Sequence, residues 1–429
     1  MTDGLETCDV VVVGGGIVGR SIALFAAQAG LQVAVVEAGG ATFGTSSANA
    51  GHLVPSHRVP FAAPGMVKAG LHSLLTRDGA FAISPRVMWR IAPWLVRFAR
   101  NSTPTNVARG VPVLATLLDT TVREVQRLRA DGAELDFADG GIVQVCTTMS
   151  SLDELQHEAD EWARWGVHTE RWSADELAAA EPAVRDRAVG AVLLADDARC
   201  DPAALLAAVT ARGDAGGVNT LTATVQRIEH LGRDDVRVHT SLGVVGARQV
   251  VIAAGVWSAA LCAGVGTRIP VVAARGNSIT LAPGVAAAPH RPLLLVDQRL
   301  AVSPLSSGLR ITGGFGLTST SDRATSARRS QQLVRRAAEV LQVPATAEPT
   351  RQWTGLRPAT PDGLPVIGRL PGAPSVIVAA GHGMLGSSTG LGTGAAVAAL
   401  LTGAPAIIDE AAVSPTRFAR GRTKGDSAR

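Results

Sequence analysis

The first forty residues alternate apolar runs with glycine-rich turns. Residues 8–13 end in DVVVV, which predicts a strand buried on both faces. Small and apolar residues then recur at helical spacing from residue 22 to residue 29, and Gly30 is placed to end that helix. A second apolar run at residues 32–36 predicts another buried strand, which leads to Glu37. This strand–helix–strand order is typical of an α/β unit.

Further along the chain, the pattern predicts a second set of strands. Apolar, strand-like segments lie at residues 142–147, 189–194, 271–281 and 309–314. A helical pattern at residues 326–341 is placed to cover them. These segments predict a second sheet that is largely antiparallel and separate from the first α/β unit.

The turn between the first strand and the helix has the spacing G-x-G-x-x-G. Gly14 permits a tight turn, Gly16 permits close approach of backbone amides to a pyrophosphate, and Gly19 permits close packing of the helix on the strand. The helix N-terminus attracts phosphate charge. Glu37 lies 23 residues after Gly14, where a carboxylate accepts hydrogen bonds from a ribose. Two flanking strands and this acid predict a dinucleotide site, but the turn alone does not separate FAD from NAD.

Composition and charge exclude several other classes of protein. The chain has 429 residues, 46% of them hydrophobic, which excludes disorder over most of its length. The formal charge of +4 is spread along the chain, so we expect no nucleic-acid partner. The four cysteines are far apart and no H-E-x-x-H is present, so we expect no metal site. The N-terminus lacks a signal-peptide pattern and no long uncharged apolar run is present, which predicts a cytoplasmic protein.

Two later segments add candidate chemistry. Residues 44–52, GTSSANAGH, form a small polar run that can donate hydroxyl and amide groups to a second phosphate. Residues 353–368 read WTGLRPATPDGLPVIG. After a predicted strand at 375–379 comes the loop GHGMLGSSTG at 381–390, which opens a predicted helix at 394–401.

Together these motifs resemble the superfamily of FAD-dependent D-amino-acid oxidases and dehydrogenases. The resemblance rests on G-x-G-x-x-G, GTSSANAG, VVIAAGVW at 250–257, GLRPATPDGLPVIG and GHGMLGSSTG, in this order. Residues 51–101 are more particularly similar to the bacterial D-amino-acid dehydrogenase branch. The resemblance extends to about residue 408 and implies FAD as the cofactor.

The predicted fold class is α/β, or α+β overall. The resemblance implies a Rossmann-like FAD-binding domain with an interleaved substrate domain built on a largely antiparallel sheet. We assign residues 1–55, 196–270 and 350–416 to the FAD domain and residues 56–195 and 271–349 to the substrate domain. Residues 417–429 are expected to form a disordered basic tail.

The resemblance also implies which residues contact the cofactor. On the ADP half, at the pyrophosphate and around the flavin, it places Gly14, Gly16, Ile17, Val18, Gly19, Glu37, Ala38, Ser46, Ser47, Asn49, Ala50, Gly51, His52 and Leu53. From the later segments it adds Val225, Ala254, Gly255, Trp257, Gly355, Arg357, Gly381, Gly383, Met384, Leu385 and Gly386. Some relatives attach flavin to a histidine or a cysteine, but here the histidine position is Ala48 and no cysteine follows Cys262. We therefore expect non-covalent FAD.

The implied reaction is oxidation of the amine of a small amino acid, expected to be a D-amino acid. The product is the imino acid, with hydride passing to flavin N5, and water then gives a 2-oxo acid and ammonia. Arg357 occupies the carboxylate-binding position, since a guanidinium binds a carboxylate bidentately. The alternative is that Arg357 pairs with a structural acid such as Asp362. His52 and His382 are candidates for proton transfer, and equally for packing.

Three features leave the substrate open. The chain contains no tyrosine, so no tyrosine lid or phenol can bind the substrate carboxylate. The dehydrogenase branch usually has an aromatic where this chain has Asn277, and an acid at the end of the strand that here reads RITGGFG (residues 310–316). The alternatives are therefore an enzyme for cyclic or N-substituted substrates (D-proline, 4-hydroxy-D-proline, sarcosine or glycine) and a non-catalytic dinucleotide-binding protein.

The segment at 85–101 mixes tryptophans with arginines. As a basic amphipathic helix it would suit a peripheral contact with the inner face of a membrane, where a quinone accepts electrons. The favoured interpretation is a packing helix whose arginines face water. Pro93 argues against one uninterrupted helix. The electron acceptor, quinone or oxygen, is left open.

Overall fold

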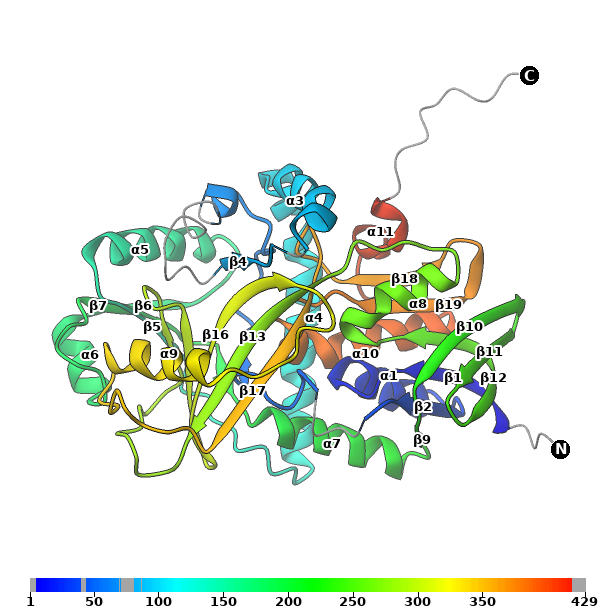
Figure 1. Ribbon diagram of the computed structural model, residues 1–429, viewed down its shortest axis with the longest axis horizontal. Coiled ribbons are helices and arrows are strands. Elements are labelled where there is room, and N and C mark those ends of the chain that lie inside the picture. The colour runs from blue at the N-terminus through cyan, green and yellow to red at the C-terminus, as the bar shows by residue number, and fades with distance from the viewer. Residues whose placement is uncertain (1–4, 40–43, 69, 71–80, 86, 419–429) are drawn as a thin grey trace, which may run out of the picture.

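The computed structural model describes residues 5–39, 44–68, 70, 81–85 and 87–418. Two sheets lie side by side along the long axis of the molecule, and the long helix α4 (Pro104–Ala130) stands between them (Figure 1). Among the described residues, eight strands form the first sheet, in the order β10-β11-β12-β1-β2-β9 with β19 and β18 attached to β12. Its strands are β1 (Leu5–Val13), β2 (Val33–Glu37), β9 (Asn219–Thr222), β10 (Val225–Gly232), β11 (Asp235–Thr240), β12 (Gly243–Ile252), β18 (Val366–Leu370) and β19 (Ala373–Ala380).

The centre of the first sheet is parallel. β1 pairs with β2 on one side and with β12 on the other, and β12 pairs with β19, all in parallel register. The valines of β1 from Val10 to Val12 have no exposed surface, as the unbroken apolar run predicted. Their side chains alternate between the two faces, so each face packs against its own layer of the core.

Two helices pack closely on this sheet because glycines remove side chains from their contact. They are α1 (Ile17–Gln28) and α10 (Gly386–Thr402). A Cβ atom at Gly392 would overlap the carbonyl oxygen of Leu117 in α4, and one at Gly394 would lie 2.7 Å from the Ser21 backbone. The prediction for α10 was wrong in its start, since the helix begins at Gly386 and not at residue 394. Its glycines are tolerated because close packing on α1 and α4 offsets their low helix propensity.

The second sheet is largely antiparallel, which confirms the predicted fold class. Among the described residues, nine strands form it, in the order β17-β13-β16-β15-β14-β5-β7-β6, with β4 beside β16. They are β4 (Phe81–Ile83), β5 (Ile142–Cys146), β6 (Thr169–Ser173), β7 (Gly190–Leu194), β13 (Val272–Leu281), β14 (Leu293–Leu295), β15 (Leu300–Leu305), β16 (Gly308–Thr318) and β17 (Arg351–Ala359). Only the β5–β14 and β4–β16 pairs are parallel among these described strands.

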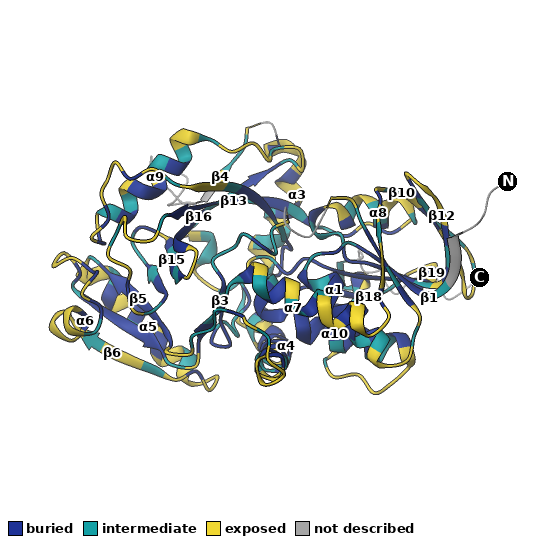
Figure 2. Cartoon of the chain, turned by 90° about the horizontal axis from the view of Figure 1, so that it is seen from below, coloured by how far each residue is buried: buried dark blue, intermediate teal, exposed yellow. Residues whose placement is uncertain are grey.

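The two faces of this second sheet differ in polarity. Apolar residues such as Ile279 and Ile311 form a core with α9 (Ala327–Ala338). The alternate positions on the same strands include Ser278, Thr312 and Arg310, which are buried although polar. Figure 2 shows buried strands between helices that are exposed on their outer sides. Burial of a polar group is costly unless it is hydrogen-bonded, so this face needs polar partners from the protein or from a ligand.

The remaining elements cover the edges. They are α3 (Met88–Asn101), α5 (Met149–Ala163), α6 (Ala174–Ala180), α7 (Pro202–Ala215), α8 (Ser258–Gly264), α11 (Glu410–Val413), the short helices η2 (Gly255–Trp257) and η3 (Pro415–Phe418), and the strand pair β3 (His52–Leu53) and β8 (Ala198–Arg199). None of the helices in the described part of the chain is long and apolar enough to cross a membrane.

Three local expectations differ from the structure. Pro93 lies inside the continuous helix α3, so the expected interruption is wrong. Arg417 and Phe418, expected in a disordered tail, form part of η3, and the rest of that tail lies outside the described residues. β17 pairs with β13 of the second sheet, although residues 351–359 were assigned to the FAD domain. The division into domains stays a prediction.

Candidate active site

The turn between β1 and α1 has room only for glycine at two of its positions. Gly14 has φ +113°, and a Cβ atom there would lie 2.5 Å from the Ala253 carbonyl oxygen. A Cβ atom at Gly19 would overlap the carbonyl oxygen of Gly14. At Gly16 a Cβ atom would lie 3.1 Å from Ser46 Oγ. The turn therefore presents backbone amides at the start of α1, as a phosphate site requires.

Glu37 lies directly over this turn. The Gly15 amide donates to Glu37 Oε2 at 2.5 Å, and the Gly39 amide donates to Oε1 at 3.2 Å. Both oxygens face backbone donors, and each oxygen retains capacity to accept from a ribose hydroxyl. The end of β2 thus places the carboxylate where the sequence predicted it.

The polar run at 44–52 lies between the N-termini of α1 and α10. The first amide of α1, that of Ile17, donates to Ser46 Oγ at 2.9 Å. Asn49 Nδ2 donates to Ser387 Oγ in the first turn of α10 at 3.0 Å. A Cβ atom at Gly390 would lie 3.1 Å from the Ile17 side chain, so these two helix starts are close together. Two helix N-termini at one place give a concentration of partial positive charge.

The second sheet holds the same run from its polar face. Ser303 Oγ donates to the Ala50 carbonyl oxygen at 2.6 Å, and Arg310 Nη1 donates to the Asn49 carbonyl oxygen at 3.3 Å. Ser303 and Arg310 are register partners on β15 and β16. Neither residue was predicted from the sequence as a member of the site. The available signal was an arginine at an inward position of an apolar strand, whose charge needs a partner.

Arg357 on β17 crosses the same face without a carboxylate partner. Its guanidinium lies over Gly276, where a Cβ atom would be 2.5 Å from Cζ, and Nη1 donates to the Gly314 carbonyl oxygen at 2.6 Å. Burial lowers the pKa of Arg357 to about 10. Among the described residues no acid pairs with it. Four of its five N–H donors are therefore available to a ligand carboxylate.

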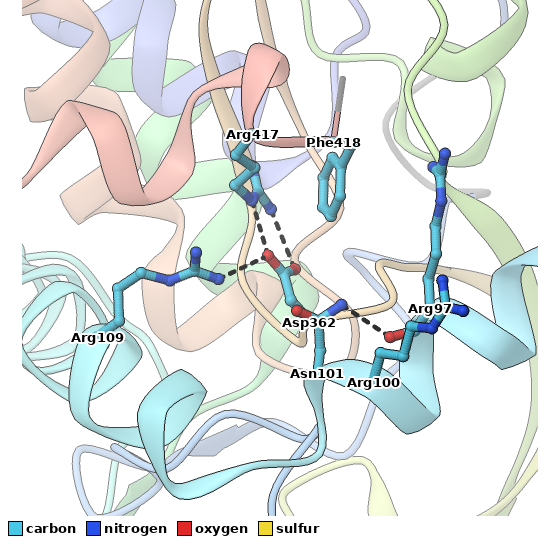
Figure 3. A pocket seen from close by; sticks show the side chains of 7 residues that line it. All are labelled: Arg97, Arg100, Asn101, Arg109, Asp362, Arg417 and Phe418. Atoms are coloured by element: carbon cyan, nitrogen blue, oxygen red, sulfur yellow. Dashed lines mark hydrogen bonds and ion pairs between the residues drawn. The ribbon is translucent and has the colours of Figure 1, made fainter. Parts of the chain in front are cut away.

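Asp362, the alternative partner for Arg357, is engaged elsewhere. Arg417 Nε donates to Asp362 Oδ2 at 2.7 Å and its Nη2 donates to Oδ1 at 3.1 Å (Figure 3). Arg109 adds a longer contact to Oδ2 at 3.4 Å. The structural salt bridge in this segment is thus formed by Asp362 and Arg417.

The loop at 381–386 lies beside Arg357. The Gly383 amide donates to the Pro358 carbonyl oxygen at 2.8 Å. Gly381 has φ +85°, and a Cβ atom there would lie 2.5 Å from the Thr360 methyl group. Thr45 Oγ1 also donates to the Leu356 carbonyl oxygen at 3.0 Å, which ties the first polar run to this segment. The structure therefore brings the three candidate segments of the sequence together.

The two candidate histidines differ in their partners. His382 Nε2 lies 3.0 Å from Thr393 Oγ1, a contact that suits packing. His52 Nε2 is buried without a hydrogen-bond partner among the described residues. Burial lowers the pKa of each to about 4, so both are neutral at pH 7. His52 is therefore the one with an unpartnered ring nitrogen.

The other predicted cofactor residues lie at varying distance from this centre. Leu53 packs with Ile17 in one apolar cluster, and Ala254 and Gly255 follow β12 next to the glycine turn. Val225 begins β10, two residues after Ala223, whose amide donates to the Glu37 carbonyl oxygen at 3.0 Å. Others have large exposed surfaces: Trp257 is 46% exposed, and Met384 is 55% exposed. The roles of all these residues stay predictions.

The residues present fit FAD. The glycine turn and Glu37 suit an adenosine diphosphate, the two helix starts suit its phosphates, and the unpartnered His52 Nε2 adds a polar atom that needs a ligand. Beside them Arg357 offers a fixed positive charge to a second, anionic ligand. The arrangement can therefore hold a dinucleotide and a carboxylate side by side.

Comparison with known proteins gives consistent matches over the length of the chain. The model of the family "FAD dependent oxidoreductase" matches residues 9–400. A "D-amino acid dehydrogenase" of Cereibacter sphaeroides is 32% identical over 434 residues, which cover 98% of this chain and 99% of that protein. One of Methylobacterium radiotolerans is 31% identical over 410 residues, covering 94% and 97%. The crystal structure of glycine oxidase from Geobacillus kaustophilus superposes with a TM-score of 0.75 at 26% identity, covering 96% and 99%.

Proposed function

The chain belongs to the family of FAD-dependent oxidoreductases, and we propose that it oxidises the amine of a small D-amino acid to the imino acid. FAD is the cofactor, and the chain is an amine-oxidising oxidoreductase. The proposal that the substrate has the D configuration is supported by the names of the relatives at 32% and 31% identity. The observation that carries the proposal is Arg357, a partly buried guanidinium without an acid beside it among the described residues.

Arg357 binds the α-carboxylate of the substrate. One Nη1 hydrogen bond to Gly314 fixes the plane of the guanidinium, and the missing side chain of Gly276 makes the space for it. A bidentate contact with a carboxylate then orients the Cα–H and amine of the substrate. The low polarity of the surroundings strengthens this contact, since water competes less for either charge.

The FAD would be held by the elements described above. We infer that the glycine turn and Glu37 hold its ADP half, and that the run at 44–52 and the start of α10 hold the rest. When bound, FAD supplies the oxidising chemistry by accepting two electrons from the substrate. The chain supplies position and electrostatics, and the neutral His52 offers Nε2 as a hydrogen-bonding atom at the polar face.

Release of the imino acid completes the turnover. Water adds to its C=N bond and gives the 2-oxo acid and ammonia, a step that requires no group of the chain. The two electrons pass to an acceptor that we propose to be a quinone or oxygen. We also propose that FAD is bound without a covalent link, because position 48 is alanine and no cysteine follows Cys262.

The neighbours of Arg357 on β17 favour a small substrate. The Trp353 ring covers Gly355, where even a Cβ atom would overlap it, and Trp353 lies four residues before Arg357 on the same strand face. This aromatic wall stands next to the proposed carboxylate site. The second candidate is therefore an enzyme for glycine, sarcosine or a cyclic amino acid such as D-proline, and the likeness to glycine oxidase at 26% identity favours it.

One experiment tests both candidates. The purified yellow protein is mixed anaerobically with D- and L-alanine, glycine, sarcosine, D-proline and 4-hydroxy-D-proline, and the visible flavin absorbance is followed. Bleaching by D-alanine and not by L-alanine supports the first candidate, and bleaching by glycine, sarcosine or the cyclic compounds alone supports the second. Failure of every amino acid to bleach the flavin would contradict both. Denaturation with acid should release all the flavin into the supernatant.

A further inference from the structure

A basic hollow lies where α3, α4 and η3 meet. It has a volume of about 180 Å³ and is lined by arginines of α3, α4 and η3 around Asp362. None of the residues predicted for the FAD or substrate site lines it. In Figure 3, Arg97 and Arg100 stand on the side opposite Arg109, with Phe418 between Arg97 and Arg417.

The positive charge of this hollow is not balanced by its one carboxylate. Four guanidinium groups line the hollow together with the single carboxylate of Asp362, an excess of three positive charges; they are those of Arg97, Arg100, Arg109 and Arg417. Arg417 takes both oxygens of Asp362, and Arg109 approaches one of them. Arg97 and Arg100 form no ion pair with any described residue. Like charges held together in a concave surface attract an anion.

The N–H donors that remain free in this hollow belong to Arg97, Arg100 and Arg109, and not to Arg417. Arg417 is 5% exposed and donates all five of its N–H groups, to Asp362 and to the carbonyl oxygens of Val413, Ser414 and Leu364. Arg109 uses only Nη2, so its Nε and Nη1 are available within the described structure. Together with Arg97 and Arg100, three arginines therefore have free donors beside the Asp362–Arg417 salt bridge. Phosphate oxygens match guanidinium forks in this way.

A second, larger hollow adjoins the first. It has a volume of about 440 Å³, shares Arg97 and Phe418 with the first, and is otherwise lined mainly by residues 266–270 and by prolines. The indole Nε1 of Trp94 in α3 donates to the Pro270 carbonyl oxygen at 3.1 Å, which fixes the two walls relative to each other. Ile269, Pro371 and Phe418 make this wall partly apolar.

We propose that these adjoining hollows bind an organic phosphate that carries an apolar group. The phosphate lies among Arg97, Arg100 and Arg109, and the apolar group lies against Phe418 and the neighbouring prolines. Two sources share this chemistry, a soluble phosphate ester and the headgroup of an anionic phospholipid. The site does not depend on the proposed reaction, because its residues are separate from Arg357 and the FAD segments.

The test measures binding to the FAD-loaded protein at low ionic strength, where charge contacts are least screened. Inorganic phosphate and hexyl phosphate are titrated by calorimetry, and we expect one site that prefers hexyl phosphate. The double variant Arg97→Ala, Arg100→Ala should weaken both ligands by about tenfold or more, because each loses charge-assisted hydrogen bonds. Phe418→Ala should reduce only the preference for the hexyl chain. Arg357→Ala should leave both affinities unchanged, which separates this site from the substrate site.

A matched control removes the same charge elsewhere. Arg328 and Arg335 are exposed on α9, on the second sheet, and the variant Arg328→Ala, Arg335→Ala should bind both phosphates as the wild type does.

Cosedimentation with vesicles of phosphatidic acid, against vesicles of phosphatidylcholine alone, then distinguishes a lipid headgroup from a soluble phosphate ester. Vesicle binding that needs Arg97 and Arg100 identifies a lipid headgroup, and phosphate binding without vesicle binding identifies a soluble ester. The proposal is overturned if neither phosphate binds saturably, or if the control variant weakens binding as much as the Arg97, Arg100 variant does.

Discussion

Arg357 is partly buried and the side chain of Arg417 is almost fully buried, and both lie at the segment 353–368, yet their surroundings are opposite. Arg417 donates to both oxygens of Asp362 and to three carbonyl oxygens, so every one of its donors is used within the protein. Arg357 donates to a single carbonyl oxygen, and the described residues offer it no acid. Burial lowers the pKa of both, and for Arg417 the charge of Asp362 opposes that effect.

This difference separates a residue that serves the fold from one that serves a ligand. A buried charge with a complete set of partners stabilises the folded chain relative to the same chain with one partner removed. A buried charge with unused donors costs stability until a ligand supplies the missing partner. The two arginines should therefore respond to substitution in opposite ways, and four measurements test or refine that contrast.

The largest effect is expected for Arg357→Ala. Loss of a buried contact to the substrate carboxylate costs about 2–5 kcal/mol, so kcat/KM should fall by roughly 30-fold to several thousand-fold. FAD content and Tm should stay close to those of the wild type, because Arg357 has no structural acid to leave behind. Arg357→Lys should recover only part of the activity, since an ammonium group cannot form the bidentate contact. Near-normal activity of the Ala variant would remove Arg357 from the substrate site.

Arg417→Met should show the reverse pattern. It leaves Asp362, which has no exposed surface, with the Leu364 amide at Oδ1 and the long contact to Arg109, and removing one partner of a buried pair costs about 3–5 kcal/mol. The free energy of unfolding, measured with urea, should fall by that amount, while kcat/KM of the folded fraction stays within about threefold of the wild type. Arg109→Met is the control, because its half-exposed contact is worth about 1 kcal/mol or less. A stable Arg417→Met variant that has lost activity would reverse the roles of the two arginines.

The sequence predicted the local elements better than the partners of these charges. The valine run of β1, the glycine turn and Glu37 are recognisable because their chemistry depends on neighbours in the chain. The start of α10 was missed because its glycines and serines resemble a loop until α1 and α4 pack against them. Pro93 was read as a break, although the helix α3 continues through it.

The pairing of charges between distant segments could not be predicted from the sequence. Asp362 stands five residues after Arg357, which made it a reasonable partner, but the fold brings Arg417 to it from the end of the chain. Arg310 was missed for the same reason, since its acceptor, the Asn49 carbonyl oxygen, is 261 residues away. Single-sequence patterns report periodicity and turns, and they carry no information on which charges meet across two sheets.

Arg310 is an intermediate case, and its substitution sharpens the comparison. It is 5% exposed and donates to the Asn49 carbonyl oxygen in the run proposed to hold FAD. Arg310→Met removes that hydrogen bond, and it also removes the cost of burying the charge, so the free energy of unfolding should change little. The dissociation constant of FAD should rise roughly fivefold, which corresponds to about 1 kcal/mol of binding free energy. Ser303→Ala should act in the same direction through the Ala50 carbonyl oxygen. Arg351→Met, which removes an exposed charge near Arg310, is the control, and an equal loss of FAD affinity there would contradict the role assigned to the hydrogen bond.

The smallest effect is expected from a buried acid that, like Arg357, has no opposite charge beside it. Asp197 accepts hydrogen bonds from the Ser56 amide at 3.0 Å and the Ser56 hydroxyl at 2.7 Å, and burial raises its pKa from 3.8 to about 7. Between these two pH values the folded state holds the proton more tightly than the unfolded state does, so stability should fall as the pH rises from about 4 to about 7. The effect of His52 on stability has the opposite sign. Burial lowers its pKa from 6.5 to about 4, so its contribution to stability is lost as the pH falls through that interval. Asp197→Asn should remove the loss on the alkaline side and raise Tm at pH 6 relative to pH 5 by about 2 °C, on the order of 1 kcal/mol, compared with the same difference in the wild type. Identical pH profiles of Tm for Asp197→Asn and the wild type would mean that this carboxyl group ionises in the folded protein as freely as in the unfolded chain.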